Sequence, residues 1–106
     1  MLPSEFIEEW ADEQERREWL QGGYMMHGGA CVLGASRYAQ IRLGLDHRDQ
    51  SVILARRIVG DVVKEWAGMR PLPLFNDIPG RTKAEVLDVL RLAAKRARLH
   101  EEGLDG

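Results

Sequence analysis

The stretch Phe75-Asn76-Asp77-Ile78-Pro79-Gly80-Arg81-Thr82-Lys83-Ala84-Glu85 decides the fold, because it sets a polar turn directly against the start of a long, periodic helix. Thr82 and Glu85 have the spacing of a capping box, in which each side chain accepts a hydrogen bond from the backbone N–H of the other residue. Pro79 and Gly80 cannot continue a helix. The sequence therefore predicts that a helix starts at Thr82.

The positions of helix-breaking Gly and Pro residues and the spacing of apolar residues predict four helices and no strand, so the expected fold is an all-α bundle. The helices are expected at residues 4–20, 31–43, 51–67 and 82–102. A Gly-rich loop at 22–30 and a Pro-rich connection at 70–81 join them. The whole chain, residues 1–106, is expected to form one domain.

The first predicted helix has an interrupted apolar stripe. Ser4 is its expected N-cap, and Gly22-Gly23 is expected to end it. The charged residues 12–18 separate two apolar ends. Either this stretch bulges into solvent while both ends dock, or the first two turns pack on another molecule.

Composition narrows the class of protein. Hydrophobic residues make up 44% of the 106 residues and charged residues 30%, which is the balance of a folded globule. The single cysteine excludes an internal disulfide and fits a reducing compartment, so a cytoplasmic location is expected. No apolar run is long enough to span a bilayer, and no membrane partner is expected.

The charges argue against general affinity for nucleic acid. The formal net charge is −2, whereas polyanion binding needs a basic face. Acidic residues crowd positions 5–15 and basic residues crowd 91–98. We interpret both groups as solvated helix surfaces that match the helix dipoles.

Three motifs together resemble a known family. They are Trp19-Leu20-Gln21-Gly22, Cys31-Val32-Leu33-Gly34-Ala35, and the block from Phe75 to Thr82. In this order, over roughly residues 10–97, they resemble a family of small uncharacterised helical domains from high-GC Gram-positive bacteria and their phages. The resemblance implies a fold and a bacterial or phage source, and it transfers no catalytic residue.

Cys31 is the candidate for catalysis. It opens a predicted helix, where the dipole favours a thiolate. A hydrolase or transferase would also need a base, such as His27 or His47, and an orienting Asn76 or Asp77. The alternative is a buried cysteine that acts as a small apolar residue.

Metal and cofactor binding are not expected. His27 and Cys31 lie four residues apart, but Gly28-Gly29 interrupt any helix between them, and no second ligand pair exists. The Gly-rich residues 22–29 lack the lysine and the preceding strand that phosphate-binding and dinucleotide-binding loops need.

Two groups of residues are candidates for binding. In the first, Asn76, Asp77 and Arg81 either brace the turn into the last helix, with Asp77 paired to Arg81, or bind a small polar ligand. In the second, Trp10 with Phe6 forms an aromatic anchor for a partner protein. Trp66 is assigned to the core instead.

These features leave three classes of function open. The first is a non-enzymatic interaction or regulatory protein, phage-encoded and acting on a host protein, which would bind a protein partner or a second copy as a homodimer. The second is a small thiol-dependent hydrolase or transferase that uses Cys31. The third is a DNA-binding helix-turn-helix formed by residues 31–43 and 51–67, which the long connection between them disfavours.

Overall fold

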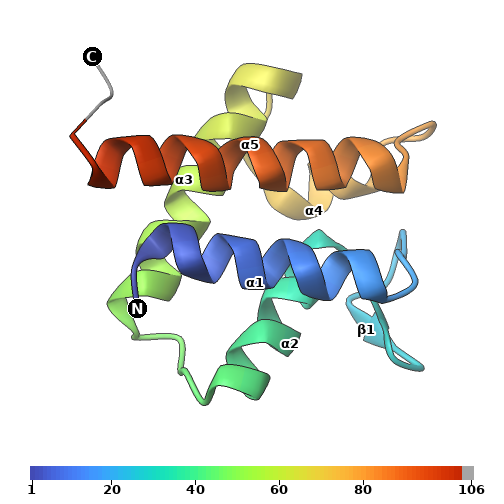
Figure 1. Ribbon diagram of the computed structural model, residues 1–106. Helices are drawn as coiled ribbons and strands as arrows, with labels where there is room; N and C mark the ends of the chain where they lie inside the picture. Colours follow the sequence, from blue (N-terminus) through green and yellow to red (C-terminus); the bar gives the residue numbers. More distant parts are fainter. Residues whose placement is uncertain (104–106) are drawn as a thin grey trace.

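The computed structural model describes residues 1–103, which form five helices and a short β-hairpin (Figure 1). In chain order the elements are α1 (Pro3–Arg16), β1 (Met25–Met26), β2 (Gly29–Ala30), α2 (Val32–Leu43), α3 (Gln50–Ala67), α4 (Leu72–Asp77) and α5 (Lys83–Glu101). The expected helical bundle is thus confirmed in outline. The prediction of a purely α-helical fold is wrong, because the described part contains a two-stranded antiparallel sheet.

Helix α1 is the centre of the bundle. Figure 1 shows α1 and α5 side by side and antiparallel, with α3 crossing behind them. Helix α1 also packs against α2 and α3, so the core forms around its apolar side chains. None of the helices in residues 1–103 combines the length and the hydropathy needed to cross a bilayer.

The predicted capping box at the start of α5 is confirmed. The Thr82 hydroxyl accepts a hydrogen bond from the Glu85 N–H at 3.2 Å, and the Glu85 carboxylate accepts one from the Thr82 N–H at 2.9 Å. These two bonds satisfy donors that the first turn of the helix leaves without partners. The helix therefore begins at Lys83, directly after its cap.

The predicted bounds of α1 need correction at both ends. Its N-cap is Leu2 rather than Ser4, and Pro3 occupies the first helical position, where its missing N–H costs nothing. Both the backbone N–H and the hydroxyl of Ser4 donate to the carboxylate of Glu101, at 3.0 and 2.5 Å. Ser4 therefore ties the start of α1 to the end of α5. The helix ends at Arg16, four residues before the predicted end.

Neither alternative for the first helix holds in full: its first turns are buried within this chain, and residues 12–18 do not all bulge into solvent, since Glu13 and Gln14 are both buried. They lie seven residues after Phe6 and Ile7, so the helical period places them on the same inward face. The Glu13 carboxylate accepts hydrogen bonds from Arg42 at 2.6 Å and Arg17 at 2.9 Å. The Gln14 amide donates to the Ala30 carbonyl at 3.1 Å.

The acidic and basic groups at positions 5–15 and 91–98 face each other rather than solvent alone. Arg91 of α5 pairs with Asp12 at 3.0 Å and with Glu15 at 3.3 Å, and Arg98 pairs with Glu8. Because α1 and α5 are antiparallel, Glu8 in the first half of α1 meets Arg98 near the end of α5, and the later acids of α1 meet Arg91 in the middle of α5. The pairing is part of the contact between the two helices.

The Gly-rich segment folds back on itself as a hairpin. Met25 pairs with Ala30 and Met26 with Gly29, and the turn residues His27 and Gly28 both have positive φ, 52° and 81°. Two central residues with positive φ give the turn a twist that matches two short antiparallel strands. The hairpin carries Tyr24 to α2, where its carbonyl accepts from the Cys31 N–H at 3.1 Å.

The Pro-rich connection contains the short helix α4, which the sequence did not predict. Pro71 is its N-cap, and Pro73 lies in its first turn, where helices tolerate proline. Leu72 and Phe75 of this helix are buried in the core. Helix α4 thus closes the bundle over α2 and α3.

Among the described glycines, Gly34 is the one at which a side chain would meet backbone most closely. A Cβ atom at Gly34 would lie 2.0 Å from the carbonyl oxygen of Tyr24. A Cβ atom at Gly60, inside α3, would make only ordinary contacts at 3.7 Å with Arg70. The hairpin can approach α2 only because residue 34 has no side chain.

We predict that Gly34→Ala destabilises the protein by about 1–3 kcal/mol, because the added methyl forces the hairpin away from α2. Gly60→Ala is the matched control and should change stability little or raise it by up to about 1 kcal/mol, since alanine favours helix. Urea unfolding of the two variants measures the difference. Equal stability of the two would contradict the close approach of Tyr24.

Glu13 gives a prediction for pH. Burial raises the pKa of Glu13, but hydrogen bonds from Arg42 and Arg17 and the charge of Arg16 outweigh this effect. The pKa therefore lies below its ordinary value of 4.5. A carboxylate with a depressed folded-state pKa stabilises the fold above its ordinary pKa, and this contribution is lost as the pH falls.

We predict that Glu13→Gln lowers the free energy of unfolding at pH 7 by about 1–3 kcal/mol. The variant should also lose less stability than the wild type between about pH 5 and pH 3. Chemical unfolding across that range tests both parts. The control, Glu15→Gln on the exposed side of α1, should keep the wild-type slope, and a Glu13→Gln slope as steep as the wild type would refute the argument.

Candidate functional site

The three motifs that carried the family resemblance meet at one side chain, that of Asn76. It lies at the end of α4 and is 0% exposed. Its carbonyl oxygen accepts from the indole N–H of Trp19 at 2.7 Å and from the backbone N–H of Val32 at 2.8 Å. Its NH₂ group donates to the Leu20 carbonyl at 2.8 Å and to the Asp77 carboxylate at 2.9 Å. All four hydrogen-bonding positions of the amide are therefore used inside the chain.

A second layer of hydrogen bonds surrounds this amide. Gln21 donates to the carbonyls of Asn76 at 3.1 Å and Ile78 at 3.0 Å, and the backbone N–H of Gly22 donates to Asp77 at 3.0 Å. The hydrogen bond from the Asn76 amide, followed by that from Gly22, lowers the pKa of Asp77. Asp77 is thus an ionised acceptor that fixes the segment after α1.

The predicted pair between Asp77 and Arg81 is absent from the described contacts. Arg81 instead donates to the Phe75 carbonyl at 3.0 Å and lies 3.6 Å from the Glu85 carboxylate. Its guanidinium stacks over the rings of Phe75 and Trp66, with centroid distances of 4.3 and 5.0 Å. Such stacking is typical of arginine on aromatic faces. Arg81 braces the turn into α5, but through other partners than predicted.

Trp66 is not a core residue. Its side chain is 44% exposed, although one edge contacts Phe75 at a centroid distance of 5.9 Å. It lies in the last turn of α3, beyond the buried positions Val62 and Val63. Helical spacing alone predicted burial, but at the end of α3 the Trp66 ring is covered only in part, by Phe75 and Arg81.

Phe6 and Trp10 lie inside the chain rather than on its surface. Both are 0% exposed, and the Trp10 indole N–H donates to the Val32 carbonyl at 2.7 Å. Their rings contact each other at a centroid distance of 6.3 Å. The expectation of an exposed aromatic anchor on α1 is corrected, because α1 is the central helix and its apolar face is fully covered.

Cys31 serves as the N-cap of α2. Its side chain is 7% exposed, and the sulfur accepts from the Gly34 N–H at 3.4 Å. It lines a hollow of about 210 Å³ together with Tyr24, Pro73 and Asp77. Within residues 1–103, no histidine or carboxylate makes a hydrogen bond to this sulfur.

The histidines proposed as partners lie elsewhere. His27 is exposed at the tip of the hairpin, and His47, in the loop after α2, lies 3.5 Å from the Gln40 amide. Asp77 lines the same hollow as Cys31, but within residues 1–103 no histidine contacts the sulfur, so a base and an orienting group are not assembled there. No three His, Cys, Asp or Glu side chains gather as a metal-binding group in the described part of the chain.

A groove that the sequence did not reveal lies between α3 and α5. It has a volume of about 640 Å³. Charged residues line it around the apolar Ile58 and Ala97, and two ion pairs cross its rim, Arg70 with Asp61 at 2.5 Å and Arg96 with Glu65 at 2.6 Å. The remaining lining residues are Lys64 and His100.

Sequence analysis also did not identify Arg56, a charged residue on the apolar face of α3, as a notable position. It lies four residues after Val52 and three before Val59, which is the spacing of one helix face. The interruption of the apolar stripe by a charged residue was the sequence signal that could have identified Arg56. Glu13 and Gln14 of α1 show the same pattern.

We predict that Asn76→Ala lowers the free energy of unfolding by about 3–5 kcal/mol, because it leaves the Trp19 indole, the Val32 N–H and the Leu20 carbonyl without partners. Asp88→Ala, at an exposed position of α5, is the control and should change stability by less than about 0.5 kcal/mol. Urea unfolding followed by tryptophan fluorescence measures both. Similar values for the two variants would show that Asn76 does not hold these segments together.

Comparison with known proteins gives one match. Residues 1–96, from α1 to most of α5, match a family described as "Family of unknown function (DUF6197)". Neither a curated protein nor a solved structure matches the chain. Since the match covers most of the 106 residues, the chain belongs to DUF6197, a family of unknown function.

Proposed function

We propose that this protein is a non-enzymatic interaction protein that binds a short segment of a partner protein in the groove between α3 and α5. The observation that carries the proposal is the groove itself, about 640 Å³ in volume, with apolar side chains inside a charged rim. This volume is within the range of sites that enclose a ligand or several side chains. An apolar centre with a polar rim is also the usual anatomy of a protein interface.

The rim charges favour an acidic partner. Asp61 and Glu65 are each paired with an arginine of the rim, whereas Lys64 forms no ion pair in residues 1–103. A segment that places an apolar side chain against Ile58 and Ala97, and a carboxylate near Lys64, would complement the groove. We therefore propose an acidic segment with an apolar anchor as the occupant.

The other two classes of function receive less support. The thiol of Cys31 has a backbone N–H as its only polar partner in residues 1–103, so the proposed enzyme lacks an assembled site. In a helix-turn-helix the two helices pack on each other. Here α2 packs mainly against α1, and α3 packs against α1 and α5.

The setting of this interaction is part of the proposal. The likeness of the three motifs to small domains of high-GC Gram-positive bacteria and their phages supports a bacterial host protein as the partner. A phage-encoded modulator would meet that partner in the cytoplasm, where Cys31 stays reduced.

A peptide-display selection against the immobilised protein tests the proposal. We expect the selected peptides to combine an apolar residue with a nearby Asp or Glu, and we expect Lys64→Glu to weaken their binding about tenfold, or about 1.4 kcal/mol. Lys95→Glu, on the exposed side of α5, makes the same charge change outside the groove and should leave binding unchanged.

Two outcomes would refute the proposed occupant. One is selection of peptides that bind wild type and Lys64→Glu equally well. The other is a homodimer, detected by sedimentation at increasing concentration, that Lys64→Glu dissociates, because a second copy would then occupy the groove.

A further inference from the structure

Arg56 of α3 bridges to α2 through hydrogen bonds, although the two helices make little direct contact otherwise. Arg56 lies on the inward face of α3, and its guanidinium reaches α2. One terminal nitrogen, Nη2, donates to the Gln40 amide oxygen at 2.6 Å and to the Ser36 hydroxyl at 3.1 Å. Ser36 and Gln40 are both 0% exposed. The charged group therefore lies among buried, neutral partners.

No carboxylate in residues 1–103 balances this charge. Eight other arginines of the described chain form ion pairs with acids, namely Arg16, Arg17, Arg42, Arg70, Arg81, Arg91, Arg96 and Arg98. Arg56 forms none, although its Nε atom is sealed from solvent and has no hydrogen-bond partner. Partial burial of a cation without a counter-charge is costly, so an anion beside the guanidinium would stabilise this arrangement.

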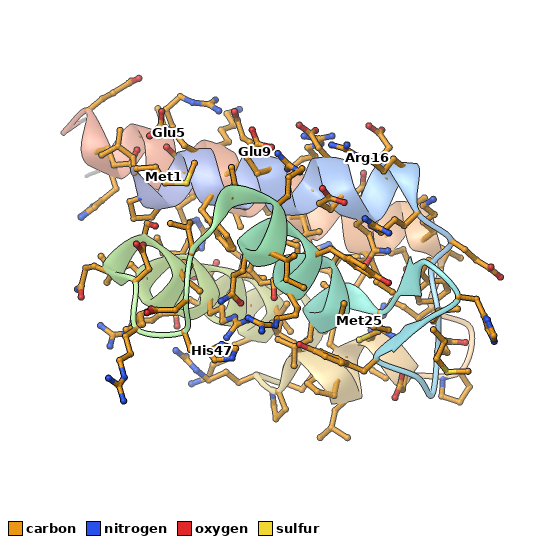
Figure 2. The ribbon with its side chains drawn as sticks, turned by 90° about the horizontal axis from the view of Figure 1, so that it is seen from below. Met1, Glu5, Glu9, Arg16, Met25 and His47 are labelled. Carbon is orange, nitrogen blue, oxygen red and sulfur yellow. The ribbon has the colours of Figure 1, made fainter. Side chains whose placement is uncertain are left out.

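The surroundings of Arg56 add positive charge. Burial lowers the pKa of Arg56, and so does the nearby charge of Arg37, while Tyr24 acts in the opposite direction. His47 lies beside Gln40, on the side of the molecule that Figure 2 shows away from α1. The groups that face the guanidinium from α2, the hairpin and the following loop are thus basic or neutral.

We propose that the space between α2 and α3 binds a small oxyanion, a phosphate or carboxylate group, on the guanidinium of Arg56. A guanidinium is a strong hydrogen-bond donor to either anion, and because Nη2 is already occupied by Gln40 and Ser36, the donor available here is Nη1. Its Nη1 atom makes no hydrogen bond within residues 1–103 and, unlike Nε, is not sealed from solvent. Arg37 adds attraction, and the half-exposed Tyr24 can offer its phenol O–H.

This site is separate from the proposed peptide groove. Arg56 does not line the groove, and Asp61 and Glu65 follow it by five and nine residues. At 3.6 residues per turn these offsets place them on the opposite side of α3. The alternative role for Arg56 is a purely internal bridge between α2 and α3, which added anions would not affect.

An NMR titration of the ¹⁵N-labelled protein distinguishes the two roles. Sodium phosphate and sodium acetate are added in separate series, each matched in ionic strength with sodium chloride, while the Arg56 side-chain N–H resonance is followed. We expect a saturable shift with phosphate, acetate or both, and none with chloride. The anion that binds more tightly identifies the ligand group.

Three variants show whether the shift reports this site. Arg56→Met should abolish saturable binding, read from backbone resonances of α2, and Arg37→Met should weaken it about tenfold. Arg57→Met, one residue along on the exposed side of α3, should bind as the wild type does. If Arg56→Met does not fold, the wild-type titration and Arg37→Met still test the site.

The absence of a saturable shift with both anions would overturn the proposal. Binding that Arg37→Met and Arg57→Met weaken equally would also overturn it, because it would reflect general charge attraction. Neither result would affect the peptide groove, which Lys64→Glu tests separately.

Discussion

The side-chain amide of Asn76 is the constraint on which the rest of the structure depends. It is buried and makes four hydrogen bonds, to the segment after α1, to the first turn of α2 and to its neighbour Asp77. A buried polar group that loses its partner costs about 1–3 kcal/mol. The segments that meet at Asn76 are therefore coupled, since moving any one of them leaves polar groups of the others without partners.

This coupling gives the most specific motif of the chain a structural role. Asn76 has no free donor or acceptor for a ligand, Asp77 accepts from Gly22, and Arg81 stacks on Phe75. A motif can thus be distinctive because its side chains hold separate segments of the fold together. Residues available for binding have to be sought on surfaces that the hydrogen bonds of Asn76 do not use, and α3 offers two of them.

The sequence predicted those features that depend on neighbours along the chain. The capping box of α5 is local, and the predicted bounds of the helices at 31–43, 51–67 and 82–102 fall within one residue of those observed. Two-residue strands have no detectable period, and the short α4 begins with prolines, so both escaped prediction. The partners of Glu13, Arg56 and Asn76 come from distant segments, and spacing cannot identify them. The local sequence suggested that Arg81 braces the turn into α5, but it did not identify the partners of Arg81, which include Phe75 and Trp66.

The distribution of charge explains how a chain with a net charge of −2 can favour anionic partners. The acids of α1 are largely occupied, because Asp12 and Glu15 pair with Arg91, and Glu13 accepts from Arg17 and Arg42. On α3, by contrast, Arg56 and Lys64 lack acidic partners in the described chain. Net charge therefore describes the long-range field, whereas local recognition depends on which charges the fold leaves unpaired. Both surfaces of α3 are basic in this local sense, which is why we propose an acidic segment for one and a small oxyanion for the other.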